Sequence, residues 1–270
     1  MRTHYNAMQI HATDPAYAAS DDSRTRFRAA ALVSVMFVAA LAFIHFVSWA
    51  LGLDLQRFGI HPRDVAGLGG IVMAPLLHGD VLHLASNALP LLIGGTALLY
   101  LYPDSSRFVL PAVYVVPGIL VWLFARDSIH IGASGLVYGL VAYICVAGLL
   151  RRDRRALAAS ILVAFLYGAS VWGVLPLEDG VSWETHLAAA LIGLAMAIVY
   201  RHTDVPPRVQ YSWELEAQQA REDEAAVGDG IEPFPMPASF RGTATPDGAG
   251  NSPLAERGNE SSSPASHTLH

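Results

Sequence analysis

This chain carries little charge and almost no cysteine for its length. Only 15% of its 270 residues are charged, 53% are hydrophobic, and the mean hydropathy is +0.38. The charged residues gather at the chain ends and in short connections between long apolar runs, which excludes an ordinary soluble domain and indicates a polytopic membrane protein. Cys145 is the single cysteine, so the chain can form no internal disulfide, and its place in an apolar run predicts a buried thiol.

Lysine is absent as well, and all 17 basic residues are arginine, which we attribute to a GC-rich genome and not to function. The net charge of −6 comes mainly from the acidic C-terminal segment, so it identifies no partner. A cleavable signal peptide is not expected, because about 28 polar and mixed-charge residues precede the first apolar run, which is too long for a signal-peptide core.

Six apolar runs are long enough, or nearly so, to cross a bilayer core that needs about 20 helical residues. They cover residues 29–51, 81–101, 108–125, 134–150, 156–175 and 185–200. Pro90, Pro111 and Pro117 fall inside these runs, which membrane helices tolerate because neighbouring groups satisfy the freed carbonyls. The pattern therefore predicts an all-α fold, a bundle of six transmembrane helices. The long connection 54–77 includes an apolar stretch, 66–74, that is too short to span and is expected in the interface.

The arginines between these runs divide unevenly over the two sides. The connections on one side carry ten: Arg24, Arg26, Arg28, Arg107, Arg151, Arg152, Arg154, Arg155, Arg201 and Arg208. The other side carries three: Arg57, Arg63 and Arg126. Because positive charge concentrates on the cytoplasmic side, both termini are expected in the cytoplasm. We expect a cytoplasmic segment at 1–27, a six-helix domain at 28–203, and a tail at 204–270 whose Glu, Asp, Gly, Pro and Ser content predicts disorder.

Ser134 and His186 are the residues that point to catalysis. A serine hydroxyl becomes a nucleophile when a base such as histidine takes its proton. With the predicted topology the second, fourth and sixth helices all begin at the outer side, and Ser134, His186 and the pair His83 and Asn87 lie near these starts. The four side chains are therefore expected at one depth, which suggests peptide hydrolysis inside the bilayer. No third triad member is apparent, because Glu184 lies on a different helix face from His186.

Peptide hydrolysis also requires donors aimed at the oxyanion of the tetrahedral intermediate. His83 and Asn87 are four residues apart and so project from one helix face, and the backbone N–H of Ser134 is a further candidate. The alternative is that they only form interhelical hydrogen bonds that hold the bundle together. Tyr138 lies one turn after Ser134, where its ring is placed either to stack on His186 or to pack in an ordinary way.

Small residues recur at matched spacings on the fourth and sixth helices. Gly135 and Gly139 lie four apart on one helix, and Ala189 and Gly193 lie four apart on the other. Small residues let helix backbones approach closely in membranes, so these positions predict a close crossing.

Together these residues resemble the rhomboid family of intramembrane serine proteases. The matching stretches are His78-x4-His83-x3-Asn87, Gly132-Ala133-Ser134-Gly135 with Tyr138, and His186 followed by Ala189 and Gly193. The resemblance covers about residues 28–203. It implies that Ser134 is the nucleophile, His186 the general base, and His83 and Asn87 the oxyanion donors. It also implies supporting roles for His78, Tyr138, Gly132 and Gly135, with His78 structural or holding water.

Two departures from the family pattern are visible. Ala189 stands where family members usually carry glycine, and the Trp-Arg pair that many members have in the first external loop is not evident. The extra methyl group of Ala189 bears on how closely the fourth and sixth helices approach each other. The missing Trp-Arg pair bears on how the first external loop is anchored and how the substrate enters.

The resemblance implies a bacterial multi-pass protein of the cell membrane that cleaves transmembrane segments of other membrane proteins near the outer face. No cofactor, metal or nucleic acid is expected in this activity. Two other functions stay open. A catalytically silent rhomboid-like protein would bind transmembrane segments without cutting them, but such proteins typically lack the serine or the histidine. A small transporter using His83 and His186 would fit the composition, but it gives no reason for the Gly-Ala-Ser-Gly stretch.

Overall fold

The structure is a computed structural model that describes residues 20–151, 153–178, 180–205 and 212–229. Six long helices make up the membrane unit. They are α2 (Asp21–Leu51), α4 (Val81–Leu101), α5 (Pro103–Phe124), α6 (Ser134–Arg151), α7 (Arg154–Tyr167) and α8 (Trp183–Val199). The predicted all-α fold is confirmed. Five predicted runs correspond to one helix each, with α2 and α5 beginning earlier than the apolar pattern indicated, and the run 156–175 covers α7 together with a 3₁₀ segment.

Shorter helical pieces connect the long ones. The connection after α2 contains η1 (Gln56–Phe58), η2 (Val65–Gly69), α3 (Gly70–Met73) and η3 (Ala74–Leu76), and η4 (Gly168–Val174) continues α7. Side chains at Ser20, Asp80 and Asp153 cap α2, α4 and α7 by accepting a backbone N–H of the first turn. Pro90, Pro111 and Pro117 lie inside α4 and α5 as expected.

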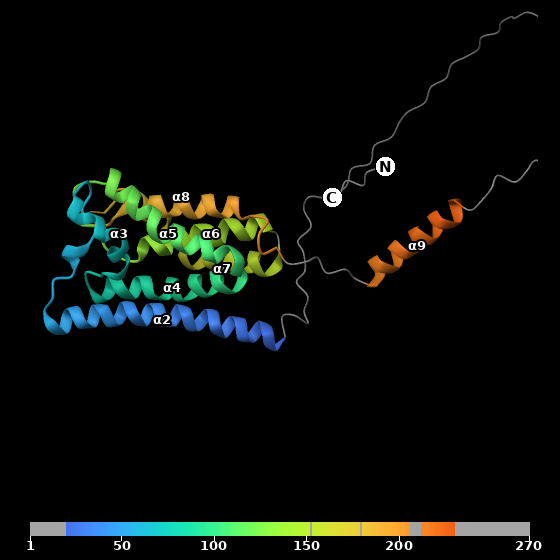
Figure 1. Cartoon of the computed structure of the whole chain (residues 1–270), viewed down its shortest axis with the longest axis horizontal. Helices are drawn as coiled ribbons and strands as arrows, with labels where there is room; N and C mark the ends of the chain where they lie inside the picture. Colours follow the sequence, from blue (N-terminus) through green and yellow to red (C-terminus); the bar gives the residue numbers. More distant parts are fainter. Residues whose placement is uncertain (1–19, 152, 179, 206–211, 230–270) are drawn as a thin grey trace, which may run out of the picture. The chain divides into compact units, whose positions relative to one another are not determined.

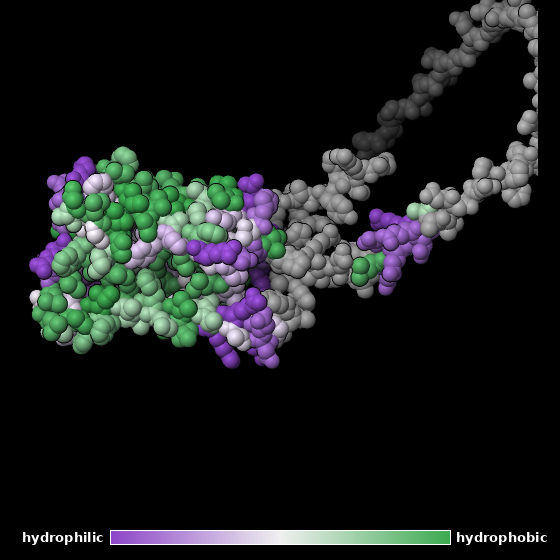
Figure 2. All heavy atoms as spheres, viewed as in Figure 1, coloured by the Kyte–Doolittle hydropathy of each residue, from purple (hydrophilic) through white to green (hydrophobic). Residues whose placement is uncertain are grey.

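Five helical segments are long and apolar enough to cross a membrane, counting α7 and η4 as one, and α8 with its 17 residues is shorter. Large apolar side chains such as Trp49 and Phe165 are 75% and 84% exposed. Figure 2 shows hydrophobic residues over the middle of the membrane unit and hydrophilic residues toward its two ends. Such a broad apolar surface suits lipid as its solvent, so this unit is a multi-pass membrane protein.

Helix α6 is the centre of the bundle and packs against α4, α5, α7 and α8 (Figure 1). Its crossing with α8 is the closest, as predicted: a side chain at Gly193 would collide with the backbone of Gly139. Ala189 is fully buried at this crossing, and its Cβ lies 4.0 Å from where a Cβ at Gly135 would be. The methyl group at Ala189 is therefore accommodated without separating the helices.

A buried polar cluster joins helix ends at the end of the bundle where α6 finishes. The Arg151 guanidinium donates to the carbonyl of Leu101 (2.8 Å) and to that of Asp204, and it lies 4.5 Å from the centre of the Tyr102 ring. It also pairs with Asp153 at 3.3 Å, with both side chains about 95% buried. We call Arg151, Tyr102, Asp153 and Asp204 the polar clasp. The sequence had suggested only a loop charge at Arg151.

Asp204 extends the clasp to the start of α5. Its carboxylate accepts the backbone N–H groups of Asp104 (2.8 Å) and Ser105 (2.9 Å), so a residue that follows α8 caps the first turn of α5. The first turn of α2 reaches the same end, where the hydroxyls of Ser23 and Tyr100 are 2.7 Å apart.

A separate unit contains α9 (Ser212–Asp229). These residues belong to the tail that was expected to be disordered, so that expectation is wrong for them. The reason is local: the segment is rich in Glu, Ala and Gln, which favour helices, and Gln218 bonds Glu222 one turn on (3.0 Å). The rest of the predicted tail beyond residue 205, and residues 1–19, lie outside the described residues.

Candidate active site

The start of α6 is shaped by glycine. Gly132 has φ +109°, a backbone conformation that favours glycine, and its N–H donates to the carbonyl of Ala74 (2.9 Å). A Cβ at this position would lie 2.6 Å from Nε2 of His83. Gly132 therefore lets the loop pass directly against the His83 ring and brings Ser134 to the helix start.

Ser134 and His186 meet across the α6–α8 contact. The Ser134 Oγ is 2.7 Å from Nε2 of His186, and Nδ1 of the same ring is 2.8 Å from the carbonyl oxygen of Gly173. A carbonyl only accepts hydrogen bonds, so Nδ1 carries the proton and donates to Gly173. Nε2 is then the acceptor for the serine O–H, which is the arrangement that a general base requires.

A tyrosine ring fixes the plane of this histidine. The rings of Tyr138 and His186 are stacked with centroids 4.1 Å apart and 8° between their planes, and the Tyr138 hydroxyl donates to the carbonyl of Ser170 (2.6 Å). A side chain at Gly173 would collide with this hydroxyl and lie 3.3 Å from Nδ1 of His186. Thus two carbonyls of η4, those of Ser170 and Gly173, hold the two aromatic side chains in place.

The nearest carboxylate serves another purpose. Glu184 pairs with Arg126 (3.7 Å) and has no bond to His186 among the described residues. Sequence reasoning found no carboxylate for a triad, and it missed Gly173 and Ser170, which act through main-chain oxygens. Every residue has such an oxygen, so no residue type marks it in the sequence.

His83 and Asn87 project from the first two turns of α4. The backbone N–H of His83 donates to the capping side chain of Asp80 (2.8 Å), and the Asn87 amide donates one hydrogen to the carbonyl of His83 (2.8 Å). An amide nitrogen carries two hydrogens, so Asn87 keeps a second donor.

All four predicted residues line one cleft of about 830 Å³, together with Tyr138. They are Ser134 on α6, His186 on α8, and His83 and Asn87 on α4. Each lies near the first residue of its helix, and His186 and Asn87 are only 7% and 3% exposed. The structure thus brings together side chains that lie up to about a hundred residues apart in sequence. The four side chains therefore lie at the same end of the bundle, near the starts of α4, α6 and α8.

His78 lies behind the cleft and does not line it. It is buried, its Nε2 is 3.5 Å from the backbone nitrogen of Ala133, and its ring is 5.1 Å from that of His83. Burial, followed by the nearby His83, lowers the pKa of His78 from 6.5 to about 4, so the ring is neutral at physiological pH. A neutral imidazole has one nitrogen that can accept a hydrogen bond, and Nε2 of His78 can accept one from the backbone N–H of Ala133, the residue before Ser134.

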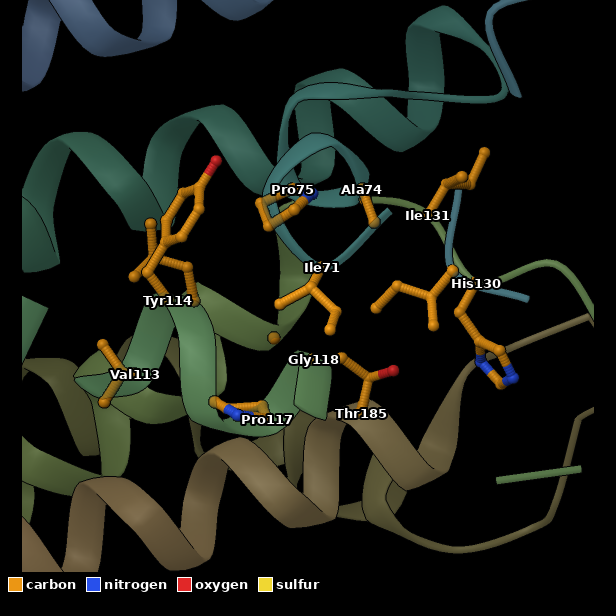
Figure 3. A pocket seen from close by; sticks show the side chains of 14 residues that line it. Ile71, Ala74, Pro75, Val113, Tyr114, Pro117, Gly118, His130, Ile131 and Thr185 are labelled. Carbon is orange, nitrogen blue, oxygen red and sulfur yellow. The ribbon is translucent and has the colours of Figure 1, made fainter. Parts of the chain in front are cut away.

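A second, much smaller cavity is bordered by α5 residues such as Val113 and Pro117 (Figure 3). It measures about 20 Å³ and is lined mainly by apolar groups, including Ile71, Pro117 and Ile131. Its lining includes none of the four predicted residues, and Ile131 borders both this cavity and the cleft. Gly135 borders it, and a Cβ at Gly135 would lie 2.8 Å from the methyl carbon of Thr185.

The fold and the cleft define a multi-pass helical membrane protein with a serine–histidine pair at one end of its bundle. A family model of the rhomboid domain matches residues 65–203, just over half of the chain. The chain belongs to the rhomboid family.

The chain is also similar to several curated proteins, one of which carries the family name. An uncharacterized protein of Mycobacterium tuberculosis is 34% identical over 185 residues, covering 64% of this chain and 76% of that protein. A similar protein of Mycobacterium leprae is 32% identical over 186 residues, covering 64% and 72%. RHOMBOID-like protein 2 of Arabidopsis thaliana is 29% identical over 146 residues, covering 51% of this chain and 42% of that protein.

Proposed function

We propose that this protein is an intramembrane serine endopeptidase with a Ser134–His186 dyad. The observation that carries the proposal is the pair of bonds on His186: Nε2 to Ser134 Oγ at 2.7 Å and Nδ1 to the Gly173 carbonyl at 2.8 Å. The membership of the rhomboid family supports it. In this dyad the Gly173 carbonyl takes the orienting role that a carboxylate has in a triad.

The geometry supports the following reaction. Ser134 Oγ attacks the substrate's peptide carbonyl carbon while its proton passes to Nε2 of His186, and the same proton then goes to the departing amine as the C–N bond breaks. His186 next takes a proton from a water, whose oxygen attacks the acyl carbon. The bond between this carbon and Ser134 Oγ then breaks, Oγ takes the proton back from His186, and the acyl product leaves as a carboxylic acid. The backbone N–H of Ser134 and the side chains of Asn87 and His83 are the proposed donors to the oxyanion.

The proposed substrates are transmembrane segments of membrane proteins in a bacterial cell membrane. The excess of arginine at the polar-clasp end supports a cytoplasmic location for that end, with the cleft near the outer face and the catalytic domain at 28–203. A stable helix hides its carbonyls in hydrogen bonds, so cleavage should favour segments whose outer part contains Gly, Pro or other helix-weakening residues. Mass spectrometry of the products locates the cut, and cuts near the cytoplasmic end would contradict this placement.

A gel assay with the purified full chain and a model transmembrane substrate tests the proposal. Wild-type protein should produce two fragments, and the serine should react with a fluorophosphonate probe. Ser134→Ala, purified in parallel, should do neither. Substrate binding without fragments would instead favour the catalytically silent alternative, and proton or ion flux in vesicles without cleavage would favour the transporter.

A further inference from the structure

An apolar groove runs along the bundle between α2 and α5, with α4 and α6 as its floor. It encloses about 470 Å³ and shares no lining residue with the catalytic cleft. Val33 and Phe37 form one wall, Leu110 and Val115 the other, and Leu140 belongs to the floor. The groove exists because α2 packs on α4 whereas α5 packs mainly on α8, so α2 and α5 do not close against each other.

The polar atoms in the groove are already satisfied. Ser34 Oγ donates to the carbonyl of Ala30 (3.1 Å), and the Tyr114 hydroxyl donates to the carbonyl of Val72 (2.7 Å). The groove therefore presents apolar surface alone, and its occupant at this depth must be apolar as well.

Cationic side chains follow the same helix faces to the polar-clasp end of the groove. Arg107 lies four residues before Pro111 and seven before Tyr114, so it is on the groove face of α5. It is exposed, lies 5.0 Å from the centre of the Phe108 ring, and forms no ion pair within the described residues. On the opposite wall, Arg26 lies seven residues before Val33.

Size decides what fits between these walls. A transmembrane helix is 10–12 Å wide and about 30 Å long, which corresponds to on the order of 2,500 Å³, several times the volume of the groove. A single hydrocarbon chain is narrow enough. We propose that the groove binds one acyl chain of an anionic phospholipid whose phosphate lies at Arg107. Guanidinium groups suit phosphate oxygens, and Arg107 lies one turn before Leu110 and Pro111 of the groove wall, at the arginine-rich end of α5.

Native mass spectrometry of the purified full chain tests this proposal. The protein is titrated with phosphatidylglycerol or with phosphatidylcholine of the same acyl chains, and the first bound lipid is quantified. We expect phosphatidylglycerol to bind about five-fold more tightly, since a cation near the headgroup contributes about that factor. Arg107→Gln should abolish this preference, and Arg107→Lys should retain it. Val33→Trp, which fills the groove from a half-exposed position, should weaken both lipids about five-fold or more.

Arg24→Gln is the matched control, because Arg24 lies at the same end on the opposite face of α2. It should leave the first binding event unchanged. Circular dichroism and size-exclusion elution establish that each variant is folded. An unchanged preference in Arg107→Gln would overturn the headgroup assignment, and unchanged binding in Val33→Trp would overturn the groove. A mass of two chains that displaces lipid would show that a second copy covers this face.

Discussion

The Nδ1–H of His186 donates to the main-chain carbonyl of Gly173 at 2.8 Å, so a seven-residue 3₁₀ segment, η4, orients the proposed base. A carbonyl carries no net charge, so it stabilises an imidazolium less than a carboxylate does. Orientation of the ring then depends on hydrogen bonding and on the stacked Tyr138.

Replacing Ser134 by Ala should reduce cleavage of a model substrate to below a few per cent of the wild-type rate. His186→Ala should give a similar loss, and the double variant should be no worse than either, because the two side chains act as a unit. Initial rates in detergent measure this, with thermal unfolding as the control for folding. Substantial turnover in Ser134→Ala would show that another nucleophile operates.

Tyr138→Phe and Tyr138→Ala separate the hydrogen bond from the stacking. Tyr138→Phe loses only the bond to Ser170, so kcat should fall by about five-fold, the worth of roughly 1 kcal/mol. Tyr138→Ala also frees the His186 ring, so a further loss of at least about ten-fold in kcat is expected while KM changes little. Equal effects of the two variants would contradict a positioning role for the ring.

Asn87→Ala should lower kcat more than it raises KM. An oxyanion donor acts mainly in the transition state, and one such donor is worth about 2.7 to 4 kcal/mol in a soluble protease. Thr96→Ala, further along α4 and outside the cleft lining, is the control and should retain activity. A change confined to KM would assign Asn87 to substrate binding.

The stability of the folded protein should fall as the pH is lowered from about 6.5 to about 4. In this window the unfolded chain protonates His78 and the folded chain does not, so the free energy of unfolding decreases with falling pH, by at most about 3 kcal/mol for this group. His78→Gln should make the dependence shallower, and the exposed His202→Gln should not. Thermal unfolding followed by tryptophan fluorescence measures how stability depends on pH. Identical pH slopes for the wild type and His78→Gln would contradict a buried neutral His78.

Gly193→Ala should destabilise the bundle, because the added methyl meets the backbone of Gly139, which has little freedom to move. Ala189→Gly is the matched control at the same crossing and removes a methyl that fits, so its effect should be smaller. Unfolding temperatures in one detergent compare the two, and a more stable Gly193→Ala would refute the close contact.

The sequence predicted the helices well because hydropathy and length determine which segments enter a membrane. Counting the membrane crossings along the chain gives the side at which each helix begins. This count predicted one common side for Ser134, His186, His83 and Asn87. The α6–α8 crossing followed from small residues at four-residue spacings. These are local patterns, and each is visible in one segment of the chain.

What the sequence did not reveal depends on tertiary contacts between segments far apart. The carbonyl of Gly173 is within reach of His186 because η4 packs against α8. Arg151 looked like one of many loop arginines, and its burial against Asp153 and Asp204 depends on where α4 and α8 end. The helix α9 was missed for another reason, since composition typical of disorder overlaps with composition that favours a helix.

The polar clasp gives the bundle a mechanical asymmetry. Ser134 and Arg151 are the first and last residues of α6, roughly 25 Å apart along its axis. At the Arg151 end, buried charges and main-chain hydrogen bonds join parts of α4, α5, α6 and the start of α7. At the Ser134 end α7 continues into η4, whose apolar side chains Val171 and Trp172 are more than half exposed. Because the ties are concentrated at the clasp end, we expect that a peptide entering the proposed active site would separate the helices at the end that holds Ser134 and leave the Arg151 end in place.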